Sequence, residues 1–175
     1  MEQLAHESIK KRPQTFPIVV IADELRTPQN VGMCLRVCEA FGVSKFYRNY
    51  QSPDLDNRMV QRTARNTDKY LEVQAYENTA NTIVKLKTEG YTVLALEITN
   101  SSKNIHQYNF TKHSKIALLI GSERFGIDPD ALLQCDGSID IAMFGLNSSM
   151  NVVNSLSVCL YEITKQLNTT KNTLS

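Results

Sequence analysis

The sequence predicts an α/β domain with a mostly parallel sheet and helices on both faces. Short apolar runs at 17–22, 91–98 and 116–120 are typical of strands that are buried on both sides. Segments with helical spacing of apolar residues separate these runs, and this alternation indicates a parallel sheet. With 175 residues, of which 42% are hydrophobic, the chain is long enough to bury one substantial core.

The first predicted helix follows the strand at 17–22. It begins at Thr27 and Pro28, because threonine is a common N-cap residue and proline is favoured at the first helical position. It ends at Gly42. The residues of its apolar stripe are Val31, Cys34, Leu35, Cys38 and Phe41. At about 100° per residue, Arg36 lies roughly 160° from the middle of this stripe and is expected to face away from the core.

The later segments continue the alternation of strands and helices. The expected elements, in chain order, are a strand around 45–47, a helix near 57–67, a strand near 70–73, a helix at 78–89, the strand region at 91–98, a polar loop at 99–114, the strand at 116–120, a short helix from Pro129, a strand at 138–143 and a last helix from Asn151 to about Leu167.

We divide the chain into a flexible, basic N-terminal arm at 1–17, a single domain at 18–168 and a short polar tail at 169–175. No apolar segment precedes the first strand, so neither a signal peptide nor a membrane span is expected. The four cysteines show no metal-ligand spacing with the three histidines, so no metal site is predicted and buried thiols are favoured. These features favour a cytoplasmic protein with reduced thiols.

The stretch Gly121-Ser-Glu123-Arg-Phe-Gly126-Ile127 directly follows the apolar run at 116–120. Open α/β folds bind ligands where strands end in this way. The stretch lacks the third glycine of a dinucleotide-binding fingerprint, and no Lys-Ser/Thr follows Gly126 as a P-loop requires. On its own, the pattern is equally compatible with a structural turn.

Two further segments accompany this loop. Asn30-Val-Gly32-Met-Cys-Leu-Arg36 lies near the N-terminus, and Ile141-Ala-Met143-Phe-Gly145 followed by Ser149-Met150-Asn151-Val152 lies near the C-terminus. In this order and spacing, the three segments resemble the three motifs of the SpoU/TrmH family of RNA ribose 2′-O-methyltransferases, within the SPOUT superfamily. The resemblance covers roughly residues 18–167.

The resemblance implies more than the periodicity does. It implies a C-terminal trefoil knot, in which the chain after Gly121 is threaded through an earlier loop, although knots are rare in proteins. It also implies transfer of a methyl group from S-adenosyl-L-methionine to RNA, with tRNA or rRNA as the partner. A homodimer is expected, with the apolar last helix as a candidate interface.

The resemblance also implies which residues hold the cofactor. Gly121, Ile141 and Met150 mark three cofactor-binding loops, and Leu96 lies at the end of the neighbouring strand. Glycine at 121 permits close approach of the backbone. For Leu96, Ile141 and Met150, ordinary core packing is the alternative interpretation.

Five residues are implied to be catalytic by the same resemblance: Arg36, Asn30, Glu123, Ser149 and Asn151. Guanidinium has a pKa above about 12 and is a poor proton acceptor. We therefore assign Arg36 to clamping a substrate phosphate and polarising the hydroxyl, and a solvated helix arginine is the alternative. The proton is accepted by that phosphate, a water or Arg36. Asn30, Ser149 and Asn151 are also common turn or capping residues, and Glu123 is either a positioning acceptor or simply exposed.

The net charge is only +1, so an RNA site must be a local patch. Arg58, Arg62 and Arg65 lie at positions i, i+4 and i+7, and Lys69 follows them. On a helix these residues form one basic face suited to RNA phosphates. A solvated charged face with no partner is equally compatible with the pattern.

Three functions are weighed against one another. The first is an S-adenosyl-L-methionine-dependent RNA ribose 2′-O-methyltransferase. The second is an RNA-binding relative without catalytic activity, and the third is a generic α/β nucleotide-binding domain with accidental motif matches. The presence of all five implied catalytic residues favours the first.

Overall fold

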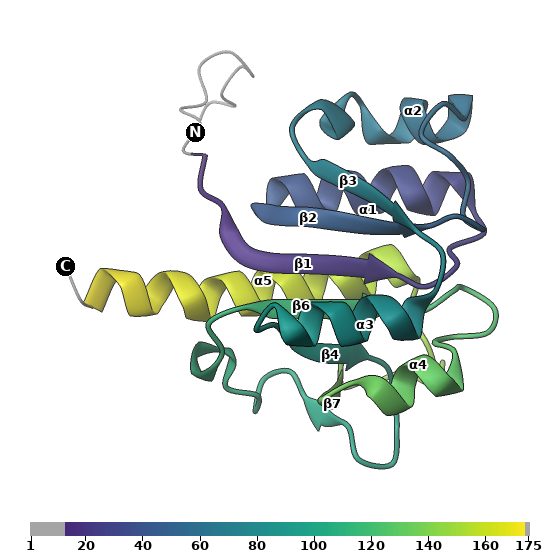
Figure 1. The fold of residues 1–175 in the computed structure, drawn as a ribbon. Helices are drawn as coiled ribbons and strands as arrows, with labels where there is room; N and C mark the ends of the chain where they lie inside the picture. The colour runs from purple at the N-terminus through teal and green to yellow at the C-terminus, as the bar shows by residue number, and fades with distance from the viewer. Residues whose placement is uncertain (1–12, 174–175) are drawn as a thin grey trace.

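The computed structural model describes residues 13–173, except for the side chains of Asp68 and of residues 170–173. Its centre is a seven-stranded sheet in the order β3-β2-β1-β6-β4-β7-β5, and all neighbouring strands are parallel (Figure 1). The strands are β1 (Phe16–Ala22), β2 (Val43–Asn49), β3 (Glu72–Tyr76), β4 (Thr92–Leu96), β5 (Lys103–Asn104), β6 (Ile116–Ile120) and β7 (Gly137–Asp140). The predicted parallel α/β sheet is confirmed.

Helices cover both faces of the sheet, as predicted (Figure 1). The helices α1 (Pro28–Ala40), α2 (Arg58–Ala64) and α5 (Val152–Thr173) belong to one apolar cluster, and α3 (Thr79–Thr88) and α4 (Pro129–Gln134) belong to the other. Successive residues of β1 alternate between the clusters: Ile18 and Val20 face α1 and α5, whereas Val19 and Ile21 face α3 and α4. None of the helices within residues 13–173 is long and apolar enough to cross a membrane.

Helix α1 follows its predicted pattern closely. Thr27 has extended backbone dihedral angles at the N-cap position and Pro28 begins the helix, but the Thr27 side chain makes no capping hydrogen bond. Four residues of the predicted stripe are buried: Val31, Cys34, Leu35 and Cys38. Phe41 lies just beyond the helix and is half-buried. Arg36 is exposed, as its angular position predicts.

Residues 99–114 were wrongly predicted to be a polar loop. They contain β5 and a short 3-10 helix, Phe110–Lys112, and the side chains of Ile105 and Phe110 are fully buried. The Phe110 N–H donates to Gln166 Oε1 at 3.0 Å, and Gln166 Nε2 donates to the Tyr108 carbonyl at 3.0 Å. This segment therefore packs against α5. Two isolated apolar residues have no periodicity that would predict such burial.

Other boundaries also differ from the prediction. Helix α2 ends at Ala64 instead of near 67, because Arg65 and Asn66 adopt left-handed conformations with φ of 51° and 63°. Helix α5 continues to Thr173, so residues 169–173 of the predicted tail are helical. At the other end, β1 already begins at Phe16, within the predicted arm. The basic run Lys10-Lys11-Arg12 lies outside the described residues.

Gly32 allows α1 and α2 to cross at close range. A Cβ atom at this position would lie 2.5 Å from the Val60 carbonyl oxygen and 2.9 Å from the Ala64 nitrogen, and it would overlap Thr63 Oγ1. The threonine hydroxyl can rotate away, but the two backbone atoms of α2 cannot move without shifting the helix. Glycine at 32 thus fixes where α2 lies relative to α1.

We expect Gly32→Ala to destabilise the fold by about 1–3 kcal/mol, because overpacking at a close helix crossing forces the backbone apart. For a domain of this size, that corresponds to a fall in Tm of roughly 2–4 °C per kcal/mol, measured by circular dichroism. Gly145→Ala is the matched control, since a Cβ there meets nothing within 4 Å. Equal melting temperatures for the two variants would contradict the close crossing.

Candidate active site

Four strands end level with one another at one edge of the sheet. Ala22 of β1 and Leu96 of β4 both pair with Ile120 of β6, and Ile139 of β7 lies opposite Leu96. The loops that follow these strands therefore meet. Open α/β sheets bind ligands at the carboxyl ends of their strands, next to the point where the strand order reverses.

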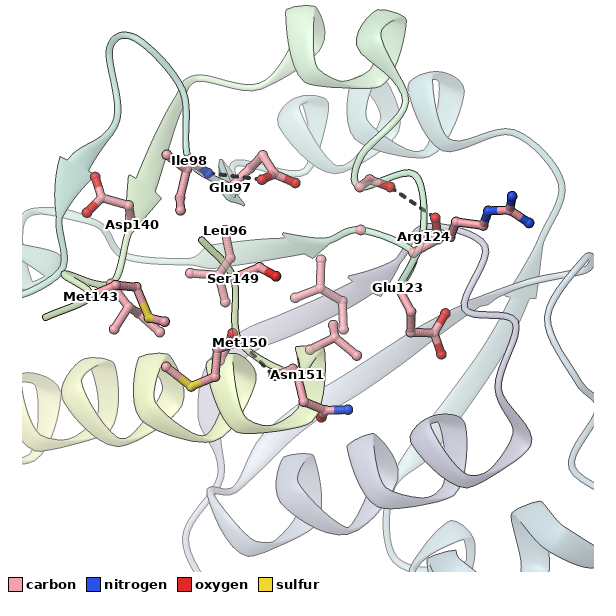
Figure 2. Close-up of a pocket in the computed structure, with 17 residues that line it drawn as sticks. Leu96, Glu97, Ile98, Glu123, Arg124, Asp140, Met143, Ser149, Met150 and Asn151 are labelled. Carbon is pink, nitrogen blue, oxygen red and sulfur yellow. Dashed lines mark hydrogen bonds between the residues drawn. The ribbon is translucent and has the colours of Figure 1, made fainter. Parts of the chain in front are cut away.

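A pocket of about 530 Å³ lies between these loops (Figure 2). Its volume is in the range of small-molecule sites. The lining residues come from the ends of β4, β6 and β7, the loop after β7 and the start of α5: Leu96, Glu97, Ile98, Ile120, Gly121, Ser122, Glu123, Arg124, Gly126, Asp140, Ile141, Met143, Ser149, Met150, Asn151, Val152 and Ser155.

All four residues that the sequence resemblance implied for the cofactor line this pocket: Leu96, Gly121, Ile141 and Met150. Leu96, Ile141 and Met150 are each half-buried and thus present part of their apolar surface to the pocket. Figure 2 draws Leu96, Ser149 and Met150 among the residues that line the pocket. The structure therefore brings the three predicted loops and the strand end together.

Gly121 is required by the loop itself. A Cβ atom there would lie 2.6 Å from both the Gly126 oxygen and the Ile127 nitrogen. These atoms belong to a tight turn in which Ser122 N–H donates to the Gly126 carbonyl at 2.9 Å and Gly126 N–H donates to the Ser122 carbonyl at 3.1 Å. Gly126 has a φ of 68°, whereas φ at Gly121 is not positive. The close approach at Gly121 is thus between two parts of one turn.

The Glu123 side chain ties this turn to the start of α1. Its Oε1 accepts hydrogen bonds from Asn30 Nδ2 at 2.8 Å and from the Thr27 N–H at 3.1 Å, and its Oε2 accepts from the Arg26 N–H at 3.0 Å. Burial alone raises the pKa of the Glu123 carboxyl, but the hydrogen bonds from Arg26, Asn30 and Thr27 outweigh burial and hold its pKa below the usual value. The carboxylate is therefore ionised and fixed in place.

Asn30 extends this network toward α5. Its Oδ1 accepts from Asn151 Nδ2 at 3.5 Å, and Asn151 Oδ1 accepts from the Val153 N–H at 2.9 Å at the N-terminus of α5. Asn151 thus caps α5 and also contacts the Glu123 network. Ser149 is exposed at the rim of the pocket. Four of the five residues implied to be catalytic therefore lie at or beside the pocket.

Arg36 is the exception. It is exposed on α1, lies six residues after Asn30 and is not among the residues that line the pocket. Six residues correspond to an axial rise of about 9 Å along a helix. Within residues 13–173, its guanidinium forms no salt bridge. A single copy of the chain does not bring Arg36 into the pocket.

The three arginines of the predicted basic face are all exposed. Asn57 caps α2, with its side chain accepting from the Met59 and Val60 N–H groups, and Arg58 and Arg62 lie one turn apart on the helix. Arg65 does not continue this face, because it adopts a left-handed conformation after the last helical residue. The prediction that all three arginines lie on one helical face is therefore wrong for Arg65, and only Arg58 and Arg62 of the three lie on the helix.

Two charged residues, one in the pocket and one at the end of β2, were missed by the sequence analysis. Glu97 lines the pocket, with its Oε1 accepting from the Ile98 N–H at 3.1 Å. Arg48 is buried at the end of β2, forms an ion pair with Asp54 at 3.2 Å and donates to the Ser52 carbonyl at 2.8 Å. It thereby braces the connection to α2. For Glu97, the only sequence signal was its place directly after an apolar strand. In the described part of the chain, no His, Cys, Asp and Glu side chains form a metal-binding group.

The fold and the pocket together define an α/β domain with a small-molecule site, and comparisons with known proteins agree with the fold. A model of the SpoU rRNA Methylase family matches residues 17–161. An uncharacterized tRNA/rRNA methyltransferase of Borreliella burgdorferi is 31% identical over 162 residues, which cover 93% of this chain and 69% of the relative. A tRNA (guanosine(18)-2'-O)-methyltransferase of Aquifex aeolicus is 25% identical, over 91% of this chain and 74% of the relative.

The SpoU methyltransferase AviRb from Streptomyces viridochromogenes, solved in complex with AdoMet, has the same fold. Its TM-score is 0.79 at 19% identity, and the match covers 94% of this chain and 65% of that chain. From the family model and the relatives, the chain belongs to the SpoU rRNA Methylase family, a family of methyltransferases.

Replacing Glu123 with glutamine should lower stability by about 1 kcal/mol at pH 7, since hydrogen bonds to an ionised group are removed at an exposed site where water screens them. Because the folded-state pKa is lowered, this contribution is complete above the unfolded-state value of about 4.3 and is lost as the pH falls through the folded value. The difference in melting temperature between the parent and Glu123→Gln should therefore shrink progressively as the pH falls below about 4.3, and it should vanish once the carboxyl is protonated in the folded state. Glu39→Gln, on the exposed side of α1, should match the parent throughout. A constant difference at all pH values would contradict the assignment.

Proposed function

We propose that this protein transfers a methyl group from S-adenosyl-L-methionine to a ribose 2′-hydroxyl of tRNA or rRNA. The observation that carries the proposal is the pocket in which Gly121, Ile141 and Met150 come together beside the network of Glu123, Asn30 and Asn151. Names of relatives specify tRNA and ribose 2'-O-methylation, so tRNA is the favoured substrate.

The pocket suits this cofactor by shape and charge. Apolar side chains of Leu96, Ile141 and Met150 offer a surface for adenine. The cofactor is positively charged at its sulfonium and its amino group, and carboxylates from Glu97 and Asp140 also line the pocket. When bound, the cofactor supplies an electrophilic methyl group on sulfur.

The protein residues orient the hydroxyl that accepts the methyl group. The ionised Glu123 and the amides of Asn30 and Asn151 form a fixed polar wall, and the exposed Ser149 hydroxyl can donate to a ribose or phosphate oxygen. In this proposal Arg36 clamps a substrate phosphate and polarises the hydroxyl. Its pKa above about 12 makes it unsuitable as a base, so the proton leaves through the phosphate or a water.

We also infer that the enzyme is a homodimer in which Arg36 of one copy reaches the pocket of the other. The distance of Arg36 from its own pocket supports this inference. Exposed apolar side chains on α1, on α5 and on the loop between β7 and α5 supply a surface for the contact: Met33, Val158, Tyr161, Phe144 and Leu146. A contact over these elements would join the α1 of one copy to the loops of its partner.

A trefoil knot is a further part of the proposal. Strand β7 lies between β4 and β5, although β4 and β5 follow one another in the chain. The connection from β4 to β5 must therefore pass around the position of β7. After β7, the chain continues into α5, which packs against α1. This arrangement supports threading of the chain after Gly121 through an earlier loop. We further infer a cytoplasmic location, in keeping with four free cysteines in the described residues.

The proposal is tested by calorimetry with S-adenosylhomocysteine and by transfer of a labelled methyl group into bulk tRNA and rRNA. The parent should bind and transfer. Arg36→Ala should reduce transfer by orders of magnitude while its cofactor affinity and melting temperature stay unchanged, because the residue acts on the substrate. Lys112→Ala, at an exposed site in the Phe110–Lys112 turn, should behave as the parent. Binding of cofactor and RNA without transfer would favour the non-catalytic RNA-binding alternative.

Charge removal on α2 tests the RNA surface. Arg58→Ala with Arg62→Ala should weaken tRNA binding and reduce the slope of log affinity against log salt by about 0.7–0.9 for each phosphate that the variant no longer neutralises. Cofactor affinity should not change. If the double variant retained both the affinity and the slope of the parent, RNA would bind elsewhere and the two arginines would be solvated surface.

A further inference from the structure

The turn between β6 and α4 carries two large side chains at its tip. Arg124 and Phe125 lie between Ser122 and Gly126, the residues whose backbone groups pair across the turn. Phe125 is 73% exposed, and the Arg124 guanidinium carbon lies 5.3 Å from the centre of its ring. A guanidinium at this distance interacts favourably with an aromatic ring. The two side chains form a cationic and aromatic surface.

This surface has a rigid support. The turn is closed by its two backbone hydrogen bonds, and the Phe125 N–H also donates to Ser122 Oγ at 3.2 Å. The Glu123 carboxylate next to Arg124 is held by three hydrogen bonds from the segment 26–30. An aromatic side chain held on such a turn loses little backbone entropy when a flat ligand stacks on it.

The position of the turn indicates what the ligand is. Arg124 lines the pocket described above, and Phe125 borders a second cavity of about 560 Å³ on the other side of the turn. Carboxylates of Asp23, Glu24 and Asp128 also line this second cavity. They repel phosphate groups, so a group that lies against Phe125 on that side is not an anion. A nucleobase is flat and uncharged, whereas the RNA backbone is not.

The proposed reaction creates a need for such a surface. When a nucleotide leaves a helical stack so that its ribose can enter a pocket, its base loses its stacking partners. Proteins that bind unpaired RNA replace this stacking with aromatic rings and arginine planes. A single aromatic side chain contributes about 1–3 kcal/mol per stacked base.

We propose that Phe125 and Arg124 form a stacking platform for one nucleobase of the RNA substrate, at the rim of the cofactor pocket. The proposal rests on the proposed function, because it assigns the RNA to this edge of the sheet. Phe125 provides the stacking face. Arg124 covers the ring from its own side and neutralises the phosphate that follows the stacked base.

The chain contains no tryptophan, so Phe125→Trp places a single fluorescent reporter on the platform. Bulk tRNA should quench its emission, whereas S-adenosylhomocysteine alone should leave the emission nearly unchanged. Phe125→Leu should weaken tRNA binding roughly 5- to 150-fold without changing cofactor affinity, and Phe125→Trp should restore it. Leu133→Ala, at an exposed apolar residue of α4 that lines neither cavity, is the control.

The outcomes separate this proposal from the proposed function. Methyl transfer by the parent together with unchanged tRNA affinity of Phe125→Leu would overturn the platform and leave the methyltransferase in place. Loss of affinity in Phe125→Leu, with quenching in Phe125→Trp but no transfer by the parent, would support the platform and overturn the enzyme. Absence of tRNA binding by the parent would overturn both.

Discussion

The hydrogen bonds to the Glu123 carboxylate are the interaction on which the site depends. They join the turn after β6 to the start of α1, two segments separated by more than ninety residues in sequence. Asn30 in turn accepts a hydrogen bond from Asn151 at the start of α5. The turn after β6, the start of α1 and the start of α5 are thus joined by one hydrogen-bond network. The donors to the Glu123 carboxylate also keep it ionised. Removing this acceptor would leave the buried Asn30 amide without its partner on the turn, and the turn would no longer be joined to the start of α1.

Much of the fold could be predicted from local pattern alone. The run at 116–120 matches β6 at both ends, because a charged residue precedes it and a glycine follows it. The stripe of α1 also predicted the exposed position of Arg36. Burial that depends on distant partners could not be predicted: Phe110 is buried because α5 returns over it, and no nearby residue signals this. The early end of α2 could not be predicted either, because no glycine or proline marks it in the sequence. The left-handed residues at this point are Arg65 and Asn66.

In the candidate site, too, some features could be predicted from local pattern and others depend on distant parts of the chain. Composition and spacing predicted only that a ligand site follows β6, and the resemblance supplied the residues that the structure then brings together around the pocket. The reason for Gly121 differed from the expected one, because the space that its missing Cβ leaves is filled by the turn itself. Glu97 remained unrecognised because a glutamate at a strand end resembles any solvated glutamate. Its significance lies in the convergence of β4 with β6, which is a property of the sheet order.

The small net charge of +1 conceals a separation of charge that suits the proposed reaction. Carboxylates of Glu97, Glu123 and Asp140 line the pocket, where a cationic cofactor would lie. Exposed arginines occur on α1 and α2, where a polyanion would dock. Since α1 and α2 are held together at Gly32, these two helices can act as one surface. The turn with Arg124 and Phe125 lies at the edge of the acidic pocket and also borders the second cavity, so the proposed platform would hold an uncharged base beside the cofactor without placing a phosphate among the carboxylates.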